Sequence, residues 1–496
     1  MLIRDLLENG NPSHHAICTD SAPPLTYREL GSQVDALAEQ LDQIGLGRGD
    51  RIAMALPNGL EVVALFLAAS TVGTAAPLNP AYTRDEFKFY LDDTGARALI
   101  IPPTGSDEAR AAAGENVMVI KTDVVDGEIR LSADASQVNR PAREAQNADD
   151  IALILHTSGT TSRPKRVPLS HVNLATSARN VAETYQLTPD DVSLCVMPLF
   201  HVHGLVASTL ATFFSGGTAV IPSKFNPLSF WTAAKQYRAT WYSAVPTIHQ
   251  VLFSRAKGKR PQGSEQLRFI RSCSAALAPQ MMADLEETFG VPVLEAYGMT
   301  EAAHQMASNP LPPATRKAGS VGQGTAVDIA ILDNEGRELA PGTTGEVSIK
   351  GRNVFGGYEG NAEANAESFS NGWFRTGDQG YLDQDGYLTL VGRIKELINR
   401  GGEKISPREI DEALLTHPAI AEAVCFGIPD RVYGEEVAAA VVLKDSATVK
   451  DLIAHCHVSL ADFKCPKKIY IVERIPRTPT GKIQRRNVAA EITKGS

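Results

Sequence analysis

The sequence predicts an α/β protein, with a large N-terminal domain of two α/β layers and a small antiparallel β part, followed by a small α+β domain. Three observations lead to this fold class. The chain has 496 residues, more than a single hydrophobic core usually organises. Helix-like and strand-like patterns alternate up to about residue 300, as in layered folds with largely parallel sheets. Beyond about residue 318 short alternating runs take over, which favours hairpins.

The first elements follow from the spacing of apolar residues. These residues recur at helical intervals over 30–41, and the run 51–56 is strand-like and ends in a Pro-Asn-Gly turn. A second apolar helix is predicted over 60–69. Residues 103–150 are charged and irregular, so we expect them to cover the surface between the two layers.

The C-terminal pattern is that of a separate compact unit. Turn residues separate the preceding short runs at 333–336 and 383–386. Ser406 as N-cap, Pro407 at the first helical position and Glu409 three residues after the cap predict a helix start. Further strands and one helix are expected over 421–426, 437–443, 449–460 and 468–472. We therefore expect two domains, 1–393 and 394–496.

Composition excludes several classes of protein. With 43% hydrophobic and 21% charged residues the chain resembles an ordinary globular protein, and its net charge of −9 gives no basic footprint for bulk nucleic-acid binding. The longest apolar run, 62–69, is too short to span a bilayer, and the N-terminus lacks a signal-peptide core. The six scattered cysteines form no C-x-x-C pair, which fits a reduced compartment. We expect a cytoplasmic protein without a membrane partner, and its oligomeric state stays open.

One short run superficially suggests a metal site. His455, Cys456 and His457 are consecutive, but neighbours along a chain rarely face one ion, and the sequence offers no second pair at ligand spacing. A partly buried helix is the better interpretation.

The segment 156–166, His-Thr-Ser-Gly-Thr-Thr-Ser-Arg-Pro-Lys-Arg, follows the apolar run 151–155. Glycine and hydroxyl groups let the backbone approach an anion, and Arg163 and Lys165 supply positive charge. The segment therefore predicts a polyphosphate-binding loop. It is not a Walker A loop, because Lys165 is followed by Arg166 rather than Ser or Thr. Taken alone, it could also be a polar surface loop.

Four further segments occur in a characteristic order: Tyr-Gly-Met-Thr-Glu at 297–301, Trp-Phe-Arg-Thr-Gly-Asp at 373–378, Gly-Arg-Ile-Lys at 392–395 and Thr-Gly-Lys at 480–482. With the loop, they resemble the acyl-adenylate-forming superfamily of acyl-CoA synthetases, luciferases and peptide-synthetase adenylation domains over nearly the whole chain. The resemblance implies that a carboxylate reacts with ATP to give an acyl-AMP and pyrophosphate, after which a thiol takes the acyl group.

The resemblance also implies roles for residues around ATP. Tyr297 would stack near adenine, with Gly298 beside it in the same motif. Thr300 would touch the α-phosphate and Glu301 would bind Mg²⁺, and both would take part in catalysis. The phosphates would be held by Thr157, Ser158, Gly159, Thr160, Thr161 and Lys165.

Further implied roles concern the ribose and the second step. Asp378 would accept hydrogen bonds from the ribose hydroxyls, and Arg393 would be a second ribose contact. Lys482 matches the catalytic lysine of adenylation, whose charge stabilises the reacting carboxylate and α-phosphate. Because a thiol must later reach the same place, the small domain is expected to rotate about a hinge at Lys395. The rotation would bring up the CoA path at Gly401 and Gly402.

Polar residues at the expected end of the acyl pocket point to a second carboxylate. His201, Ser274 and His304 would lie there, where a fatty or aryl acid needs apolar walls. Read alone, His304 would be a core histidine. The segments around these residues resemble the oxalate–CoA ligase branch of the superfamily. Malonyl-CoA synthetases share the His-x-His-Gly-Leu segment, but they carry an arginine before the Tyr-Gly-Met-Thr-Glu motif, where this chain has Ala296. We therefore favour oxalate over malonate.

Arg166 departs from the pattern, because the superfamily usually has glycine there. If the position needs a positive φ, arginine carries a strain of about 1–3 kcal/mol; otherwise it adds a cation beside the phosphates. Three alternatives therefore stay open: a ligase for malonate or another short acid, an adenylating enzyme that loads a carrier protein, and a catalytically weakened member that acts as a binding or regulatory protein. The last is motivated by Arg166 and by a basic cluster at Arg474, Arg477, Lys482, Arg485 and Arg486.

Overall fold

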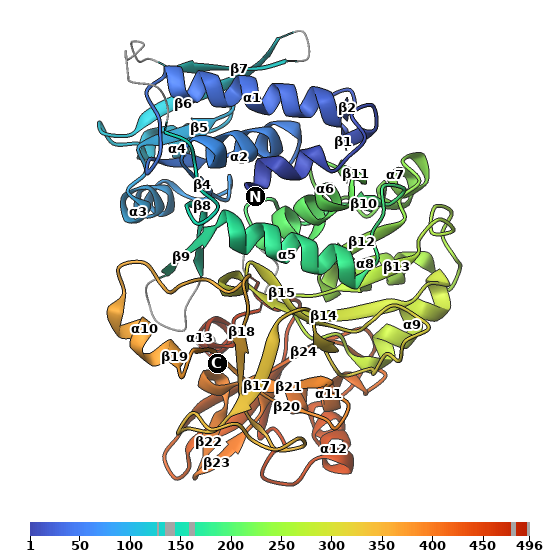
Figure 1. Cartoon of the computed structure of the whole chain (residues 1–496). Coiled ribbons are helices and arrows are strands. Elements are labelled where there is room, and N and C mark those ends of the chain that lie inside the picture. Colours follow the sequence, from blue (N-terminus) through green and yellow to red (C-terminus); the bar gives the residue numbers. More distant parts are fainter. Residues whose placement is uncertain (126–127, 134–143, 158–163, 478–482, 494–496) are drawn as a thin grey trace. The chain divides into compact units, whose positions relative to one another are not determined.

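The computed structural model describes residues 1–125, 128–133, 144–157, 164–477 and 483–493. The chain folds as two compact units, each formed from two stretches of sequence (Figure 1). The first unit is Met1–Asp328 with Lys350–Phe369, and the second is Ile329–Ile349 with Ser370–Ser496. The predicted α/β class with a smaller C-terminal part is confirmed. The domain boundary expected between residues 393 and 394 lies inside the second unit. It stays a prediction of where the rotating C-terminal domain begins.

The first unit contains a seven-stranded sheet in the order β7-β6-β5-β3-β4-β8-β9. Its five inner strands are parallel, and an antiparallel strand closes each edge. The strands are β3 (Arg51–Met54), β4 (Thr74–Pro77), β5 (Ala98–Ile101), β6 (Met118–Val125), β7 (Glu128–Ala133), β8 (Ile151–Thr157) and β9 (Lys165–Ser170). Four helices belong to this layer: α1 (Tyr27–Gln43), α2 (Leu60–Val72), α3 (Arg84–Thr94) and α4 (Asp107–Ala112).

The expectation for residues 103–150 was wrong. Instead of covering a surface between the layers, this stretch supplies α4, the inner strand β6 and the edge strand β7. The reason is that the apolar residues at 118–120 continue the sheet beside β5, while the charged residues of the same strands face outward. The predicted helices over 30–41 and 60–69 are confirmed as parts of α1 and α2.

The second sheet of this unit has nine strands in the order β16-β15-β14-β13-β12-β10-β11-β1-β2. It comprises β1 (His15–Thr19), β2 (Leu25–Thr26), β10 (Val192–Leu194), β11 (Thr218–Ile221), β12 (Trp241–Ala244), β13 (Phe269–Ser272), β14 (Val293–Met299), β15 (His304–Ser308) and β16 (Gln323–Gly324). Its helices are η1 (Ile3–Glu8), α5 (His171–Thr184), η2 (His203–Leu210), α6 (Ala211–Ser215), α7 (Phe230–Gln236), α8 (Pro246–Ala256), α9 (Pro279–Phe289) and η3 (Thr300–Ala302).

Two features of this sheet position the candidate site. β12, β13 and β14 are adjacent and parallel, so their carboxyl ends meet at one edge. β15 then turns back antiparallel to β14. Helix α5 contacts β8 and β9 of the first sheet and β15 of the second (Figure 1), so the two layers are joined near that edge.

The second unit contains two five-stranded sheets. One has the order β17-β18-β20-β19 with β21 on β20, and the other has β23-β22-β25-β24 with β26 on β25. Their strands are β17 (Asp328–Leu332), β18 (Gly345–Lys350), β19 (Phe369–Ser370), β20 (Trp373–Leu382), β21 (Leu388–Arg393), β22 (Ile398–Arg400), β23 (Glu403–Ile405), β24 (Ile420–Asp430), β25 (Gly434–Leu443) and β26 (Lys468–Ile471). The later helices of the chain are α10 (Ala362–Ser368), η4 (Ile394–Glu396), α11 (Pro407–Leu415), α12 (Val449–Ser459) and α13 (Arg485–Thr493).

The predicted helix start at Ser406 is confirmed as the start of α11, with Pro407 in its first turn. The Ser406 hydroxyl donates to the carbonyl oxygen of Val391 at 2.6 Å instead of capping the helix. The His-Cys-His run lies on α12 with only Cys456 fully buried, as expected for a partly buried helix. Among the described residues no His, Cys, Asp and Glu side chains gather in threes around a possible metal position.

Arg485 ties the last helix to the rest of the second unit. Its guanidinium donates to the Asp411 carboxylate at 2.7 Å and to the carbonyl oxygen of Cys425 at 2.8 Å. A third contact joins it to Glu396 of η4, with 3.3 Å between Nε and the carboxylate. Burial raises the pKa of Asp411, and the charge of Arg485 opposes that shift. The residues directly after the Thr-Gly-Lys motif are therefore fixed to the segment that carries the expected hinge.

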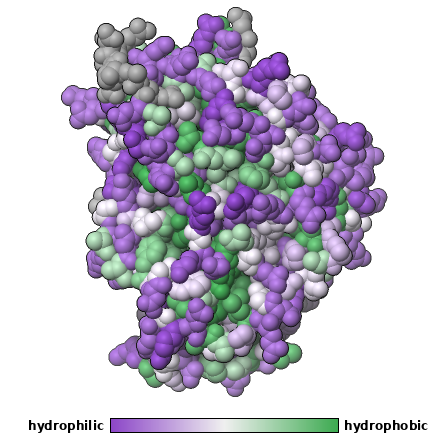
Figure 2. Space-filling model, viewed as in Figure 1, coloured by the Kyte–Doolittle hydropathy of each residue, from purple (hydrophilic) through white to green (hydrophobic). Residues whose placement is uncertain are grey.

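The surface and the thiols are ordinary for a folded chain. Hydrophilic residues occupy much of the face drawn in Figure 2, with hydrophobic residues in groups between them. No helix in the described part of the chain is long and apolar enough to cross a bilayer. All six cysteines are buried free thiols.

Candidate active site

A fully buried arginine lies at the carboxyl end of β13. Arg271 has an exposed fraction of 0%. Its guanidinium donates to Tyr185 Oη at 2.9 Å, to Gln305 Oε1 at 2.9 Å and to Ser243 Oγ at 2.9 Å. Two histidine nitrogens lie slightly farther away, His304 Nδ1 at 3.3 Å and His203 Nε2 at 3.5 Å. None of these partners, all from the described residues, is a carboxylate.

Two of the three predicted acyl-pocket residues meet around this arginine. His203 links them, because its Nδ1 lies 3.1 Å from Ser274 Oγ and its ring centroid is 5.1 Å from that of His304. The other ring nitrogen, Nε2, is 2.6 Å from Ser243 Oγ. His201, the third predicted residue, is half-buried on the same loop and accepts a hydrogen bond from the backbone N–H of His203 at 3.2 Å.

The sequence pattern His-x-His therefore did not distinguish its two histidines, of which His203, and not the predicted His201, contacts Ser274. Arg271, three residues before Ser274, was not singled out from the sequence. Its neighbours come from β12, β15, η2 and the residue after α5, and contacts between such distant segments leave no local signal in the sequence.

The backbone is strained at this end of the pocket. Ser274, Ala303 and His304 have φ angles of 72°, 50° and 117°, a region that side chains with a Cβ rarely occupy. Strain of this kind concentrates where a protein holds functional groups in fixed positions.

Gly298 allows β14 and β15 to approach each other beside His304. A Cβ at position 298 would lie 2.2 Å from the carbonyl oxygen of His304, so no other residue fits without moving the backbone. The motif glycine therefore has a packing role. It fixes the strand that carries His304.

A second group of predicted residues gathers around Tyr358. The Tyr358 hydroxyl donates to Glu301 Oε1 at 2.8 Å, and Lys165 Nζ lies 4.3 Å from the centre of the Tyr358 ring. Glu301 is 5% exposed, and its backbone carbonyl accepts from the N–H of Phe355 at 2.8 Å. The structure thus brings the loop lysine and the motif glutamate together. Tyr358 was missed, although its Gly-Gly-Tyr-Glu-Gly context is a possible signal of a loop with a close approach.

The remaining nucleotide residues of the first unit lie on neighbouring elements. Thr157 ends β8 and is paired with Lys165, the first residue of β9. Tyr297 is buried on β14, and Thr300 opens η3 immediately before Glu301. Five further predicted residues lie outside the described part of the chain: Ser158, Gly159, Thr160, Thr161 and Lys482.

Arg166 turns away from Lys165, as alternation along β9 requires. Its guanidinium contacts the backbone carbonyl of Asp93 and forms ion pairs with Asp93 and Glu359, at 3.7 Å and 3.2 Å. Glu359 also pairs with Arg51. Arg166 is not among the residues with positive φ, so the strain considered for this position is absent, and its charge is engaged by acidic residues.

In the second unit, the two predicted ribose residues contact each other. Asp378 and Arg393 are opposite each other in the β20–β21 ladder, with 3.1 Å between Arg393 Nε and Asp378 Oδ1. Asp378 is buried, whereas Arg393 is exposed. Lys395 is exposed in η4. Gly401 and Gly402, with φ angles of 59° and 99°, form the turn between β22 and β23.

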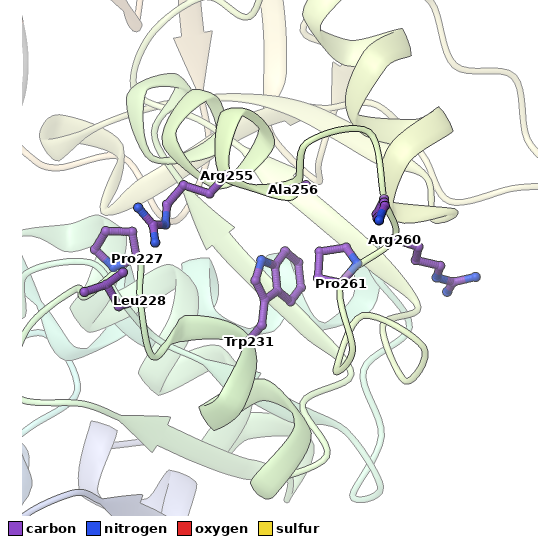
Figure 3. Close-up of a pocket in the computed structure, with 8 residues that line it drawn as sticks. Pro227, Leu228, Trp231, Arg255, Ala256, Arg260 and Pro261 are labelled. Atoms are coloured by element: carbon purple, nitrogen blue, oxygen red, sulfur yellow. The ribbon is translucent and has the colours of Figure 1, made fainter.

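A separate surface cavity of about 270 Å³ lies between α7, α8 and the segment after α8. Figure 3 shows the Trp231 ring beside Pro261, with Arg255 near Pro227. No predicted site residue lines it. The cavity is therefore not part of the candidate site.

Comparison with known proteins agrees with this geometry. A family model described as AMP-binding enzyme matches residues 8–359, and one described as AMP-binding enzyme C-terminal domain matches 409–482. The chain belongs to the AMP-binding enzyme family. It is an AMP-forming acid–CoA ligase, whose substrates are ATP, CoA and a carboxylic acid. The superfamily resemblance drawn from the five motifs is confirmed.

Three known proteins illustrate the similarity. An oxalate–CoA ligase from Arabidopsis thaliana is 47% identical, covering 98% of this chain and 97% of its own length. An oxalate–CoA ligase from Saccharomyces cerevisiae is 46% identical, covering 97% of this chain and 95% of its own length. The solved o-succinylbenzoate CoA synthetase from Bacillus subtilis, in complex with ATP and magnesium ion, is 30% identical with a TM-score of 0.85, covering 97% of this chain and 98% of its own.

The close approach at Gly298 gives a first prediction for this ligase. Because the new methyl group would meet the His304 carbonyl at 2.2 Å, Gly298→Ala must displace the strand that carries His304. Displacements of about 1 Å at a reacting site can cost about 100-fold, so we expect kcat/KM for the acid to fall by about that factor in a pyrophosphate-release assay. The control is Gly114→Ala, where a Cβ meets nothing within 4 Å. Unchanged kinetics in Gly298→Ala would contradict the packing role.

A second prediction concerns Arg166. Because its backbone is unstrained and its charge is paired with Asp93 and Glu359, Arg166→Gly should not accelerate adenylation. It should instead lower Tm by about 2–4 °C, measured by thermal unfolding. Arg166→Leu removes the charge without the flexibility of glycine and separates these two contributions. A tenfold rise in the adenylation rate of the glycine variant would show that the native residue hinders the loop.

Proposed function

We propose that the acid is oxalate and that the enzyme makes oxalyl-CoA, AMP and pyrophosphate from oxalate, ATP and CoA. The observation that carries this proposal is the buried guanidinium of Arg271, which has only neutral protein partners beside the hydroxyl and imidazole groups of the acyl pocket. Buried charges are normally paired. The second carboxylate of a small dicarboxylate supplies the missing negative charge. The two oxalate–CoA ligases at 47% and 46% identity support the same acid.

Chain geometry favours a short acid. Glu301, the expected metal ligand, and His304, at the acid end, are three residues apart. Three residues span at most about 10 Å even when fully extended. In oxalate the two carboxylates are directly bonded, so one reaches the α-phosphate while the other stays within reach of His304.

ATP is proposed to bind where the predicted phosphate residues gather. Lys165 supplies positive charge for the phosphates, together with Thr157 and the loop residues Ser158, Gly159, Thr160 and Thr161. Mg²⁺ usually takes one or two carboxylates and otherwise phosphate oxygens and water, and the buried Glu301 with Tyr358 beside it fits that pattern. The ion would neutralise charge on the triphosphate. The B. subtilis synthetase with ATP and magnesium supports this assignment.

Two bonds are exchanged in each step of the proposed reaction. An oxalate oxygen bonds to the α-phosphorus of ATP while the bond to pyrophosphate breaks, with Thr300 at the α-phosphate and Lys482 stabilising the charge. Tyr297 and Gly298 hold the adenine side, and Asp378 and Arg393 hold the ribose. The thiol of CoA then loses its proton, its sulfur bonds to the oxalyl carbon, and AMP leaves.

The two steps require different positions of the C-terminal domain, 394–496. We propose that it rotates about Lys395, which is exposed in the short η4 element directly after β21. Gly401 and Gly402 then line the path of the CoA pantetheine. Their exposed turn, with both residues at positive φ, allows a close approach of the ligand to the backbone.

Malonate is the second candidate, since its two carboxylates suit the same donors, but it needs room for one more carbon. The reading of the chain as a weakened binding protein loses its main support, because Arg166 is unstrained and ion-paired. The six buried free thiols support a reducing compartment, and we propose the cytoplasm.

The acid is tested with purified enzyme, ATP, Mg²⁺ and CoA against oxalate, malonate, succinate, acetate and an aryl acid. We expect kcat/KM to be highest with oxalate, because only oxalate has its two carboxylates directly bonded to each other. The reaction is measured both as pyrophosphate release and as loss of free thiol. A preference for any longer acid would refute the proposal. Pyrophosphate release without loss of thiol would point to a carrier protein as the acceptor.

The domain rotation is tested through Lys482. Lys482→Ala should reduce adenylation by at least 100-fold, because the ammonium stabilises charge in that step only. The reaction of preformed oxalyl-AMP with CoA should change little. Lys450→Ala, an exposed position in the same unit, is the control and should affect neither step. Equal losses in both half-reactions would contradict the rotation.

A further inference from the structure

Arg271 occupies a particular face of the nine-stranded sheet. In the parallel ladders it lies between Ser243 of β12 and Leu294 of β14, so these three side chains share one face. Ala296 lies two residues beyond Leu294 and therefore on the same face. In the related malonate enzymes an arginine is expected at that β14 position. In this chain the arginine on that face of the sheet is Arg271, which lies on β13, the strand next to β14.

The guanidinium can only donate hydrogen bonds, which fixes the state of His304. Arg271 Nη2 lies 3.3 Å from His304 Nδ1, so Nδ1 is the acceptor. A ring beside a permanent cation is favoured in its neutral form, and the hydrogen of a neutral ring then resides on Nε2. His304 therefore presents an N–H donor on the side away from Arg271.

A second chain of hydrogen bonds runs from Arg271 through Ser243 and His203 to Ser274. Arg271 Nη1 donates to Ser243 Oγ at 2.9 Å, and His203 Nε2 lies 2.6 Å from that oxygen and 3.5 Å from Nη1. Because Nε2 faces a group that only donates, it accepts the Ser243 hydroxyl hydrogen, and the His203 hydrogen resides on Nδ1. From there it is donated to Ser274 Oγ at 3.1 Å. The Ser274 hydroxyl has then accepted a hydrogen bond and is directed to donate its own hydrogen.

We propose that Arg271 is a positioning residue that fixes the tautomers of His203 and His304 and thereby makes Ser274 and His304 hydrogen-bond donors for the second carboxylate of the acid. This inference rests on the proposed function of a dicarboxylate ligase. A carboxylate only accepts hydrogen bonds, so a pocket end that only donates matches it. Tyr185 and Gln305 hold the guanidinium in place from the side of α5 and β15.

The kinetic test compares oxalate with oxamate, a monoanion of the same shape in which an amide replaces one carboxylate. We expect Arg271→Gln to lower kcat/KM for oxalate at least 100-fold, mainly through KM for oxalate, with KM for ATP and kcat/KM for oxamate changed less than threefold. Arg271→Lys, which still only donates, should recover part of the loss. Equal losses with both acids and with ATP would show a purely structural role and overturn the proposal.

Two further variants guard against misfolding as an explanation. Ser243→Ala removes the link between Arg271 and His203 but keeps the hydrogen bonds of Arg271 to Tyr185 and Gln305, so the oxalate preference should fall about tenfold while Arg271 stays buried. Arg268→Gln, on the preceding segment and paired with Asp191 at 2.7 Å, is the matched control and should leave the preference intact. An unchanged preference in Ser243→Ala would overturn the relay.

A spectroscopic measurement separates this inference from the identity of the acid. In the ¹⁵N spectrum of histidine-labelled enzyme at neutral pH, assigned with single His→Gln variants, we expect hydrogen on Nε2 of His304 and on Nδ1 of His203. Arg271→Gln should shift both signals. The opposite tautomer at either ring would overturn the proposal even if oxalate is the substrate, whereas the expected tautomers with a different preferred acid would overturn only the proposed function.

Discussion

A positive charge buried among neutral groups is the constraint on which the acyl pocket depends. Removing an ion from water costs several kcal/mol even after the protein relaxes, and Arg271 is completely buried. Tyr185, Gln305 and Ser243 satisfy its hydrogen-bonding capacity without neutralising it. The folded enzyme therefore contains an uncompensated positive charge at the proposed binding position of the second carboxylate.

The short stretch from Gly298 to His304 joins the nucleotide and acid ends of the site. It carries Glu301, the predicted metal ligand, and His304, the predicted acid-binding residue, and it reverses direction through Ala303 and His304 at positive φ. Gly298 lets the two strands close on each other. Because one rigid turn holds both groups, their separation is set by the backbone, whereas side-chain changes on β12 and β13 can alter the pocket independently.

Much of this site could be predicted from sequence, because the nucleotide motifs are local. The placement of Lys165 and Glu301 in one cluster and of Asp378 opposite Arg393 agrees with those motifs. Ser274 and His304 of the predicted acyl pocket both lie beside His203. What local patterns could not give were contacts across long sequence distances. Tyr358 reaches Glu301 from a loop 57 residues farther along the chain, and Arg271 meets His203 from 68 residues away. Arg166 was ambiguous because strand alternation, which turns it toward Asp93 and Glu359, needs a known register.

The proposed end of the pocket, which offers only hydrogen-bond donors, also affects how much ATP is consumed with the wrong acid. In the proposed arrangement, acetate and other monocarboxylates have no second carboxylate to accept hydrogen bonds from Ser274 and His304 or to balance the charge of Arg271. Unpaired buried donors of this kind penalise binding by about 1–3 kcal/mol each. Under the proposed function, the uncompensated charge of Arg271 thus limits the hydrolysis of ATP with acids that lack a second carboxylate.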